Sequence, residues 1–316
     1  MNCLCCGKPL LTPEDTGWHR SCIRRFFNTE ELPEIDVDDE SLKLLAEETV
    51  HKGFTVPGVQ KKLSLHLVRD GNKPRLTLVN YPIGYILKPQ VKQFEKLPES
   101  EQLVMSMADR AGISTVPHAL IKSKTELMYI TKRVDRIDVD GKTRKLAMED
   151  FCQLDFRLTC DKYKGSYERC AKIIKRYSSR VGIDMTEFYL RLVFCFLVGN
   201  SDMHLKNFSL IETGEASGRY VLPPAYDLLP VNANMPSDKE EFALPMNGKK
   251  TNIRKNDFLK FADACDIKRS VAERLIKSIV RYSPEFLEMC DDSLLSIELK
   301  ERLKEIITER TGTLKS

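Results

Sequence analysis

Hydrophobic and polar residues alternate in several short runs before residue 90, which is the period of a β-strand. The runs are LSLHLV at 63–68, RLTLVN at 75–80 and YILK at 85–88. Asp70-Gly71 lies between the first two runs, and this dipeptide between alternating runs is a strong hairpin signal. With a further short strand expected over 126–133, this part of the chain is predicted to form a small antiparallel sheet.

One helix is expected within this sheet-containing part of the chain, and several helices are expected after it. The first helix is predicted over 101–111, with Ser100 as its N-cap and Gly112 just past its end. From residue 148 onward the chain is mostly helical, with helices near 166–177, 185–199, 256–264, 268–281, 284–290 and 293–309 and a strand at 208–211. A sheet with one helix followed by a run of helices favours an α+β fold over a doubly wound parallel sheet.

The same pattern divides the chain into four segments. Residues 1–28 are rich in Cys, Gly and His and are too short for an apolar core of their own. Residues 29–49 form an acidic linker, with seven carboxylates between 30 and 40, followed by a short helix at 41–48. Residues 50–147 are predicted to form a sheet-containing lobe and residues 148–316 a helical lobe.

Composition and charge exclude several classes of protein. The chain has 316 residues, 42% of them hydrophobic, and its net charge of +4 is too small to indicate a nucleic-acid binder. The longest apolar stretch, 192–199, is far too short to cross a bilayer, and the N-terminus lacks the pattern of a secretory signal. A cytoplasmic protein with no membrane contact is therefore expected, in which close cysteines are metal ligands rather than disulfides.

Four residues near the N-terminus have the spacing of a zinc site. Cys3 and Cys6 form one Cys-x2-Cys pair, and His19 and Cys22 form a second pair twelve residues later. Thiolates and an imidazole suit tetrahedral Zn²⁺, which would supply the folding free energy that so short a segment lacks. A structural zinc is the favoured interpretation, and unrelated cysteines in a frayed terminus are the alternative.

A second group of polar residues follows the apolar helix predicted at 185–199. Asp202 and Asn207 are five residues apart, as are the catalytic aspartate and the metal-ligand asparagine of protein kinases, and Asp227 follows twenty residues later. One carboxylate would orient the attacking hydroxyl, while an amide and a second carboxylate would hold Mg²⁺. His204 is expected to order the loop, and Lys206 either contacts a phosphate or faces solvent.

Residues upstream could complete a nucleotide site. Lys88 ends an apolar strand, where a lysine would meet the phosphates of ATP, and Glu101 in the following helix could pair with it. The stretch TVPGVQKK, from Thr55 through Gln60 to Lys62, could cover the phosphates, although it is not a Walker A motif. Taken alone, the Lys88–Glu101 pair is more typical of ordinary exposed surface residues than of a nucleotide site.

In combination these segments resemble the HipA family of toxin serine/threonine kinases. The likeness runs from about residue 50 to 310, and its most specific part is GNSDMHLKNFSL at 199–210. The other matching segments are TVPGVQKK, YILKP, ITKRVDR, MEDFCQ, KYKGSY and AYDLLP. The resemblance implies a two-lobed kinase-like fold, with a small antiparallel-sheet N-lobe and a mostly helical C-lobe.

Family roles can be carried over to the matching positions. The resemblance implies that Lys88 binds ATP phosphates, that Asp202 is the catalytic base and that Asn207 and Asp227 hold Mg²⁺. Thr55 lies where such proteins carry an autophosphorylated serine. A protein substrate, which for this family includes aminoacyl-tRNA synthetases, and a helix-turn-helix antitoxin are the implied partners, so that DNA is contacted only through the antitoxin.

The chain departs from the family pattern at several points. Lys132 and Met148 replace a glutamate and a glutamine near the adenine pocket, which puts nucleotide affinity in question. The N-terminal subdomain of longer relatives is absent and the zinc segment stands in its place, so a separate small protein equivalent to that subdomain is expected as a further partner. The alternatives are a catalytically impaired binding protein and a small-molecule phosphotransferase. A third is a nucleic-acid platform built on the zinc segment and the basic cluster Lys249, Lys250, Arg254 and Lys255.

Overall fold

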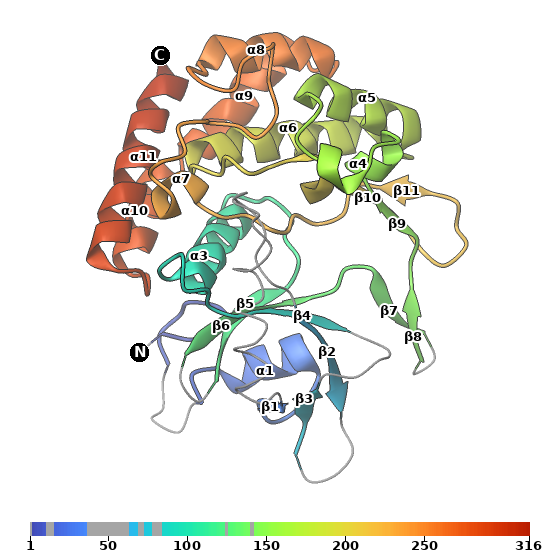
Figure 1. The fold of residues 1–316 in the computed structure, drawn as a ribbon, viewed down its shortest axis with the longest axis vertical. Helices are drawn as coiled ribbons and strands as arrows, with labels where there is room; N and C mark the ends of the chain where they lie inside the picture. Colours follow the sequence, from blue (N-terminus) through green and yellow to red (C-terminus); the bar gives the residue numbers. More distant parts are fainter. Residues whose placement is uncertain are drawn as a thin grey trace. The chain divides into compact units, whose positions relative to one another are not determined.

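The computed structural model of the chain describes residues 2–10, 16–36, 63–68, 73–77, 84–123, 126–139 and 142–316. Contacts between residues divide the chain into two compact units, whose elements are labelled in Figure 1. Unit 1 consists of Met1–Gln102 and Val116–Arg144, and unit 2 consists of Leu103–Thr115 and Lys145–Ser316.

Unit 1 contains a six-stranded sheet with the strand order β1-β3-β2-β4-β6-β5. Its strands are β1 (Glu34–Asp36), β2 (Leu63–Val68), β3 (Arg75–Thr77), β4 (Tyr85–Lys88), β5 (His118–Lys122) and β6 (Leu127–Lys132). Neighbouring strands are antiparallel except β1 and β3, which are parallel. Unit 1 also contains the helix α1 (Arg20–Phe27) and a separate two-stranded sheet of β7 (Arg136–Val139) and β8 (Lys142–Lys145). A further helix, α3, begins in this unit and is described below.

The predicted strands at 63–68, 85–88 and 126–133 are confirmed by β2, β4 and β6. The prediction of an acidic linker is wrong at 34–36, because these residues form β1 and take their hydrogen-bonding partner from β3, far along the chain. The first three residues of the strand predicted at 75–80 form β3. The last three residues of that strand and the predicted helix at 41–48 lie outside the described residues.

The helix α3 (Leu97–Arg110) begins four residues earlier than predicted. Pro98 suits the first turn of a helix, and the Gln90 side chain accepts a hydrogen bond from the Leu97 amide at 3.1 Å. Ser100 is therefore not the N-cap but a fully buried residue within the helix. The glycine expected past the end is confirmed, since Gly112 has a positive φ of 83°.

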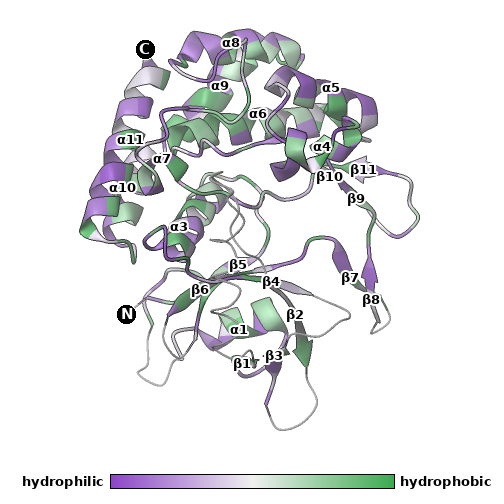
Figure 2. Ribbon diagram, in the orientation of Figure 1, coloured by the Kyte–Doolittle hydropathy of each residue, from purple (hydrophilic) through white to green (hydrophobic). Residues whose placement is uncertain are grey.

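Unit 2 is mostly helical, as predicted. Its helices are α4 (Phe151–Leu154), α5 (Tyr167–Tyr177), α6 (Val181–Leu197), α7 (Val231–Asn234), α8 (Lys255–Ala264), α9 (Arg269–Val280), α10 (Ser283–Asp291) and α11 (Ile297–Lys315), with 3-10 turns η1 (Thr159–Asp161) and η2 (Leu205–Asn207). The core surrounds α6, in which every residue from Arg191 to Leu197 is buried. Helices such as α5 show both polar and hydrophobic residues in Figure 2 because only one side of each helix is covered.

A small sheet accompanies these helices in the order β11-β10-β9. It is formed by β9 (Met148–Asp150), β10 (Ser209–Glu212) and β11 (Tyr220–Val221), and β10 matches the strand predicted at 208–211. Within the described ranges no helix has both the length and the apolar character that a membrane span requires. All ten cysteines are described and none forms a disulfide.

Candidate functional site

The loop that carries Asp202 follows directly from the buried end of α6. Gly199 has a φ of 74°, and a Cβ on this residue would lie 3.2 Å from Cγ2 of Ile306, so glycine is required here for two reasons. The amide of Asn200 donates to the carbonyl of Cys195 at 2.8 Å, which ties the loop to the last turn of the helix. The loop then leads through η2 into β10, and both flanking elements belong to the core of unit 2.

Asp202 is held through its side chain and its backbone by hydrogen bonds from within unit 2. The Tyr163 hydroxyl donates to Asp202 Oδ1 at 2.8 Å, and Nδ2 of Asn207 donates to the Asp202 carbonyl at 3.0 Å. The pKa of Asp202 is raised from 3.8 to about 7, chiefly by burial, with a smaller contribution from the negative charges of Asp227 and Asp238. The hydrogen bond from Tyr163 and the positive charge of Lys162 oppose this rise. A carboxyl group that titrates near neutral pH is suited to exchange a proton with a hydroxyl.

Asn207 and Asp227 supply the oxygen atoms that a magnesium ion prefers. The negative charge of Asp227 contributes to the raised pKa of Asp202. Asp227 has a φ of 63°, a left-handed conformation that few residues other than glycine adopt. The strand-like pairing of Ala225 with Thr115 and the hydrogen bond between Tyr226 and Ser209 hold this strained residue in place. Such a set of carboxylate and amide groups fits Mg²⁺.

The other two candidates on the loop have protein partners. His204 is 5% exposed and its ring lies edge-on to Tyr163, with 5.1 Å between the ring centroids. The Nζ atom of Lys206 lies 2.6 Å from Oδ2 of Asp150, which also caps α4. Lys206 thus stabilises the loop through an ion pair with β9.

Lys88 and Glu101 form a buried ion pair within unit 1. The Nζ–Oε1 distance is 2.5 Å, and the side chains of Lys88 and Glu101 are 4% and 0% exposed. Lys88 Nζ also lies 5.2 Å from the centroid of the Tyr129 ring, the residue paired with Lys88 between β4 and β6. Because both charges are buried, removal of either partner would leave the other uncompensated, which is strongly destabilising.

Two further candidates, Thr55 and Gln60, lie outside the described residues. The two departures from the family pattern are described. Lys132 Nζ lies 5.8 Å from the centroid of the Phe26 ring, so this lysine contacts the N-terminal segment. Met148 begins β9 and pairs with Ile211.

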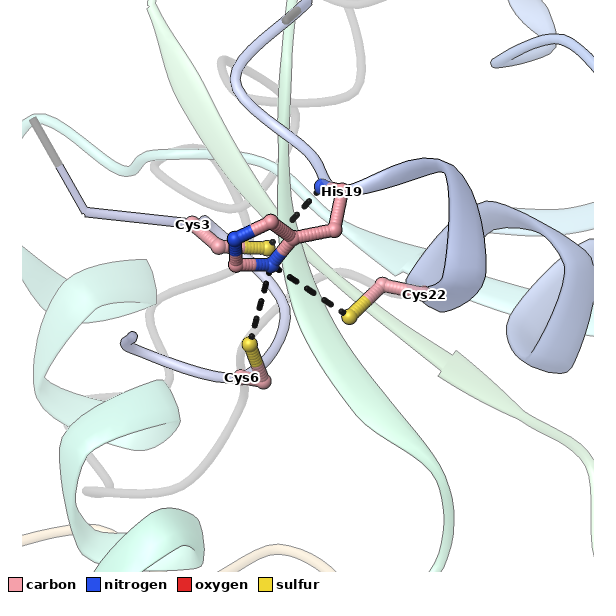
Figure 3. Close-up of side chains that lie close together, drawn as sticks. All are labelled: Cys3, Cys6, His19 and Cys22. Atoms are coloured by element: carbon pink, nitrogen blue, oxygen red, sulfur yellow. Dashed lines mark hydrogen bonds between the residues drawn. The ribbon is translucent and has the colours of Figure 1, made fainter. Parts of the chain in front are cut away.

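The four predicted zinc ligands lie together in unit 1 (Figure 3). One ligand atom from each of Cys3, Cys6, His19 and Cys22 lies within 4.8 Å of the others. Nδ1 of His19 is 3.4 Å from the Cys6 sulfur and 3.9 Å from the Cys22 sulfur. Tetrahedral zinc with ordinary bond lengths would separate an imidazole nitrogen and a sulfur by about 3.6 Å, so the arrangement fits the ion.

The surroundings of these ligands also favour metal binding. Nε2 of His19 lies 2.9 Å from the Pro9 carbonyl, an outer contact that leaves Nδ1 as the ligand atom. The backbone amide of His19 donates to the Cys3 sulfur at 3.4 Å. Burial alone would raise the pKa of Cys3, but hydrogen bonds from the backbone of Cys6, His19 and Cys5 outweigh it and lower the pKa, which favours the thiolate.

Sequence reasoning missed the residues that position these groups. Tyr163 is 39 positions from Asp202, and no local periodicity connects them. Gln102 and His118, whose side chains hydrogen-bond each other at 2.8 Å, likewise belong to different elements. For Tyr163 the one available signal was its place in the segment KYKGSY, which carried no role by itself.

Comparison with known proteins gives consistent matches to one family. A family model described as the HipA-like C-terminal domain matches residues 54–285. The putative kinase Y4mE of Sinorhizobium fredii is 29% identical over 181 residues, which are 56% of this chain and 42% of that protein. A putative kinase of Haemophilus influenzae is 28% identical over 196 residues, which are 57% of this chain and 54% of that protein. The chain spans about half the length of these curated relatives.

Solved structures agree on the fold. A chain of the Shewanella oneidensis MR-1 toxin–antitoxin complex of HipA, HipB and operator DNA gives a TM-score of 0.67 at 19% identity, over 83% of this chain and 64% of that chain. The Helicobacter pylori proinflammatory kinase CtkA gives a TM-score of 0.52 at 17% identity, over 78% of this chain and 93% of that chain. The predicted α+β, two-lobed, kinase-like fold is confirmed by these likenesses.

Proposed function

Because the chain belongs to the family of HipA-like C-terminal domains, we propose that it is a kinase that transfers the γ-phosphoryl group of ATP to a serine or threonine of a protein. The observation that carries the proposal is the half-buried Asp202 carboxyl group, which accepts a hydrogen bond from Tyr163, whose backbone carbonyl is bonded by Asn207, and whose pKa is raised to about 7. The curated relatives bear the name of putative kinases, which supports the same chemistry.

Each group has a defined task in this proposal. Asp202 accepts the proton of the substrate hydroxyl and orients it, and Tyr163 fixes the carboxylate in one position. Asn207 and Asp227 hold Mg²⁺, which when bound neutralises charge on the phosphates. Lys88, held by Glu101, binds phosphate oxygens of ATP. Thr55, in the same sequence segment as Gln60, is an autophosphorylation site.

The partners follow from the family. The similar Shewanella oneidensis assembly contains HipA, HipB and operator DNA, which supports a toxin–antitoxin role for this chain. We expect a helix-turn-helix antitoxin to bind the chain and to make the DNA contacts, and a second small protein to join the complex. Structural Zn²⁺ at Cys3, Cys6, His19 and Cys22 completes the proposed cofactors.

The proposal is tested by phosphoryl transfer from radiolabelled ATP with Mg²⁺ to the chain itself and to a mixture of cell proteins. Wild-type protein is expected to label proteins, and Asp202→Asn, which preserves shape and the acceptor for Tyr163, is expected to lose the labelling. Labelling of amino sugars without any protein labelling would instead identify a small-molecule phosphotransferase.

The variant Tyr163→Phe separates positioning from general damage. Loss of the hydroxyl removes an interaction that lowers the Asp202 pKa, so the acid limb of the rate profile should move to higher pH by about one unit. Tyr167→Phe is the matched control, because Tyr167 donates to the Met203 carbonyl in the same loop and not to a carboxylate. An equal shift in both variants would contradict the role given to Tyr163.

A further inference from the structure

The N-terminal metal segment, residues 2–10 and 16–28, is attached to the edge of the unit 1 sheet. The amide of Leu120 in β5 donates to the Leu4 carbonyl at 2.9 Å, and Nε1 of Trp18 donates to the Leu120 carbonyl at 3.1 Å. β5 is an edge strand of the described sheet, and these two bonds cover backbone groups that an edge strand leaves unpaired.

An aromatic cluster attaches the same segment to β4, the strand that ends at Lys88. Trp18 and Phe27 are 0% exposed, and the rings of Phe26 and Phe27 lie 6.0 and 5.4 Å from that of Tyr85, the first residue of β4. The Tyr85 hydroxyl also donates to the Phe26 carbonyl at 3.3 Å. The apolar side of the metal segment is therefore part of the unit 1 core, so the segment is packed against the sheet and is not a separate zinc-ribbon domain.

A third contact reaches α3. Nε2 of Gln102 donates to the Cys5 carbonyl at 3.4 Å, and Oε1 of Gln102 lies 2.8 Å from Nδ1 of His118. Desolvation lowers the pKa of His118 to about 4, so the ring is neutral and donates its Nδ1 proton to Gln102. Gln102 thus links the metal segment to β5 from the position next to Glu101.

These contacts continue through His118 and a neighbouring aromatic ring to the Lys88–Glu101 pair. The His118 ring stacks on Tyr129 with 6.4 Å between centroids and 14° between planes. Lys88 Nζ lies 5.2 Å from the same Tyr129 ring and 2.5 Å from Glu101 Oε1. A displacement of Gln102 would move both Glu101, its neighbour in α3, and His118, which packs under the tyrosine beneath Lys88.

The metal ligands enclose the two carbonyls on which this arrangement depends. Leu4 and Cys5 are the residues between Cys3 and Cys6, so one metal ion bound to both cysteines would fix the Leu4 carbonyl that faces β5 and the Cys5 carbonyl that faces α3. Among the described residues, the contacts that join this turn to the segment of His19 include the hydrogen bonds from the Leu4 amide to the Gly17 carbonyl at 2.9 Å and from the His19 amide to the Cys3 sulfur at 3.4 Å. A bound metal ion would add four strong ligand bonds to these contacts.

We infer that zinc bound at Cys3, Cys6, His19 and Cys22 positions the Lys88–Glu101 pair, with Gln102 as the positioning residue between the metal segment and the nucleotide-binding groups. The inference concerns the geometry of unit 1, and its consequence for ATP rests on the role proposed for Lys88. The metal site would then control the affinity for the nucleotide. It would do so indirectly, through the contacts of Gln102, because none of the four metal ligands is itself proposed to contact the nucleotide.

The first part of the inference, that zinc positions α3 and β5, is tested by amide hydrogen exchange of the full chain, measured with zinc bound and after chelation. We expect faster exchange at residues 97–102 and 118–122 after chelation, because the Leu120 amide and α3 lose the Leu4 and Cys5 carbonyls, and unchanged exchange in α6 of unit 2. Re-addition of Zn²⁺ should restore protection. Equal protection with and without zinc would overturn the inference, and so would retention of zinc by Cys6→Ser. Cys5→Ser should keep the metal, because the Cys5 sulfur is not among the four ligands.

The second part of the inference, that the metal controls nucleotide affinity through Gln102, is tested by a double-mutant cycle on the affinity for Mg²⁺-ATP. Chelation and re-addition of zinc should change the dissociation constant of wild type about fivefold or more, and that of Gln102→Met much less, with the zinc content of the two proteins equal. Gln93→Met, which alters an exposed glutamine before α3, should retain the wild-type response. Additive effects of metal removal and Gln102→Met would contradict Gln102 as the link. If zinc-loaded wild type binds no ATP, the proposed kinase function fails, while the exchange result still decides whether the metal positions α3 and β5.

Discussion

At the scale of single residues, Asp202 has the clearest energetic consequence. Its pKa rises from 3.8 to about 7 chiefly through burial, so between those values the unfolded chain releases a proton that the folded chain retains. Because the unfolded state then binds fewer protons, stability falls as pH rises from about 4 to 7 and stays lowered above 7. The carboxyl group proposed as the base therefore destabilises the fold at the pH at which it would act.

Asp202→Asn is expected to remove this penalty. At pH 8 the variant should be more stable than wild type, by at most about 4 kcal/mol, and at about pH 3 the two proteins should differ little, because Asp202 is then mostly protonated in both the folded and the unfolded state. Asn keeps an oxygen that accepts the Tyr163 hydrogen bond, so packing is preserved.

Urea denaturation at both pH values measures the difference. Asp263→Asn, at an exposed position of α8, is the control and should show no comparable gain at pH 8. A difference between wild type and Asp202→Asn that is independent of pH would mean that the charge of Asp202 is not costly in the folded protein.

The residues of the site that sequence could predict are those with a local signal. Asp202 and Asn207 share one loop after an apolar helix, and the two metal-ligand pairs each have fixed spacing. Tyr163 and Gln102 have no such signal, because each acts across a tertiary contact whose partner is distant in the chain. Composition and spacing identify groups that do chemistry more readily than groups that position them.

At the scale of elements, periodicity was sufficient for helices of 10–12 residues and insufficient for short strands. The ends of the longest helices, α6 and α11, differ from their predicted ranges 185–199 and 293–309 by up to six residues. The helices α5, α8 and α9 match their predicted ranges within two residues at each end, since an amphipathic face determines them locally. β1 consists of Glu34–Asp36, whose composition indicates a linker, and β5 was not predicted at all. Both edge strands depend on neighbours far along the chain, which local pattern does not reveal.

The C-terminal helix α11 stabilises the loop of Asp202 through one buried arginine. Nη1 of Arg310 donates to the Phe196 carbonyl at 2.6 Å, and Nη2 donates to Oδ1 of Asn232 at 2.8 Å. Nδ2 of Asn232 in turn lies 3.3 Å from Oγ of Ser201, the residue before Asp202. The guanidinium group also lies over the Phe196 ring, 5.0 Å from its centroid.

Arg310→Met is expected to lower the free energy of unfolding by about 2–4 kcal/mol, since it leaves the buried Phe196 carbonyl and the Asn232 amide oxygen without their charged donor. Urea denaturation followed by far-ultraviolet circular dichroism measures this change in the free energy of unfolding. Arg281→Met is the matched control, because Arg281 is exposed and contacts the neighbouring Tyr282 ring, and its effect should stay within about 0.5 kcal/mol. Equal effects of the two variants would show that α11 does not stabilise the loop through Arg310.

At the scale of the whole molecule, the distribution of charge argues against direct DNA binding by this chain. The net charge is +4 over 316 residues. In the basic cluster, Lys249 Nζ lies 2.9 Å from Asp257 Oδ1 and Lys250 Nζ lies 3.1 Å from Glu240 Oε2. In the metal segment, Arg24 is bidentate to Glu30. Carboxylates that already neutralise these cations would have to be displaced before a phosphate could bind.

The chain without an antitoxin is therefore expected to bind duplex DNA only in the non-specific range, with a dissociation constant of about 10⁻⁴ to 10⁻⁶ M at physiological salt. Fluorescence anisotropy between 50 and 200 mM salt would measure both affinity and its salt dependence, and neutralising Lys249 and Lys250 to Gln should change neither appreciably. The salt slope counts phosphate contacts, with about 0.9 of a unit for each contact, so a slope of magnitude 6 or more would require about seven cations in contact with phosphates. Such a slope, lost in the Lys249→Gln and Lys250→Gln variant, would place DNA recognition in this chain instead of in the proposed antitoxin.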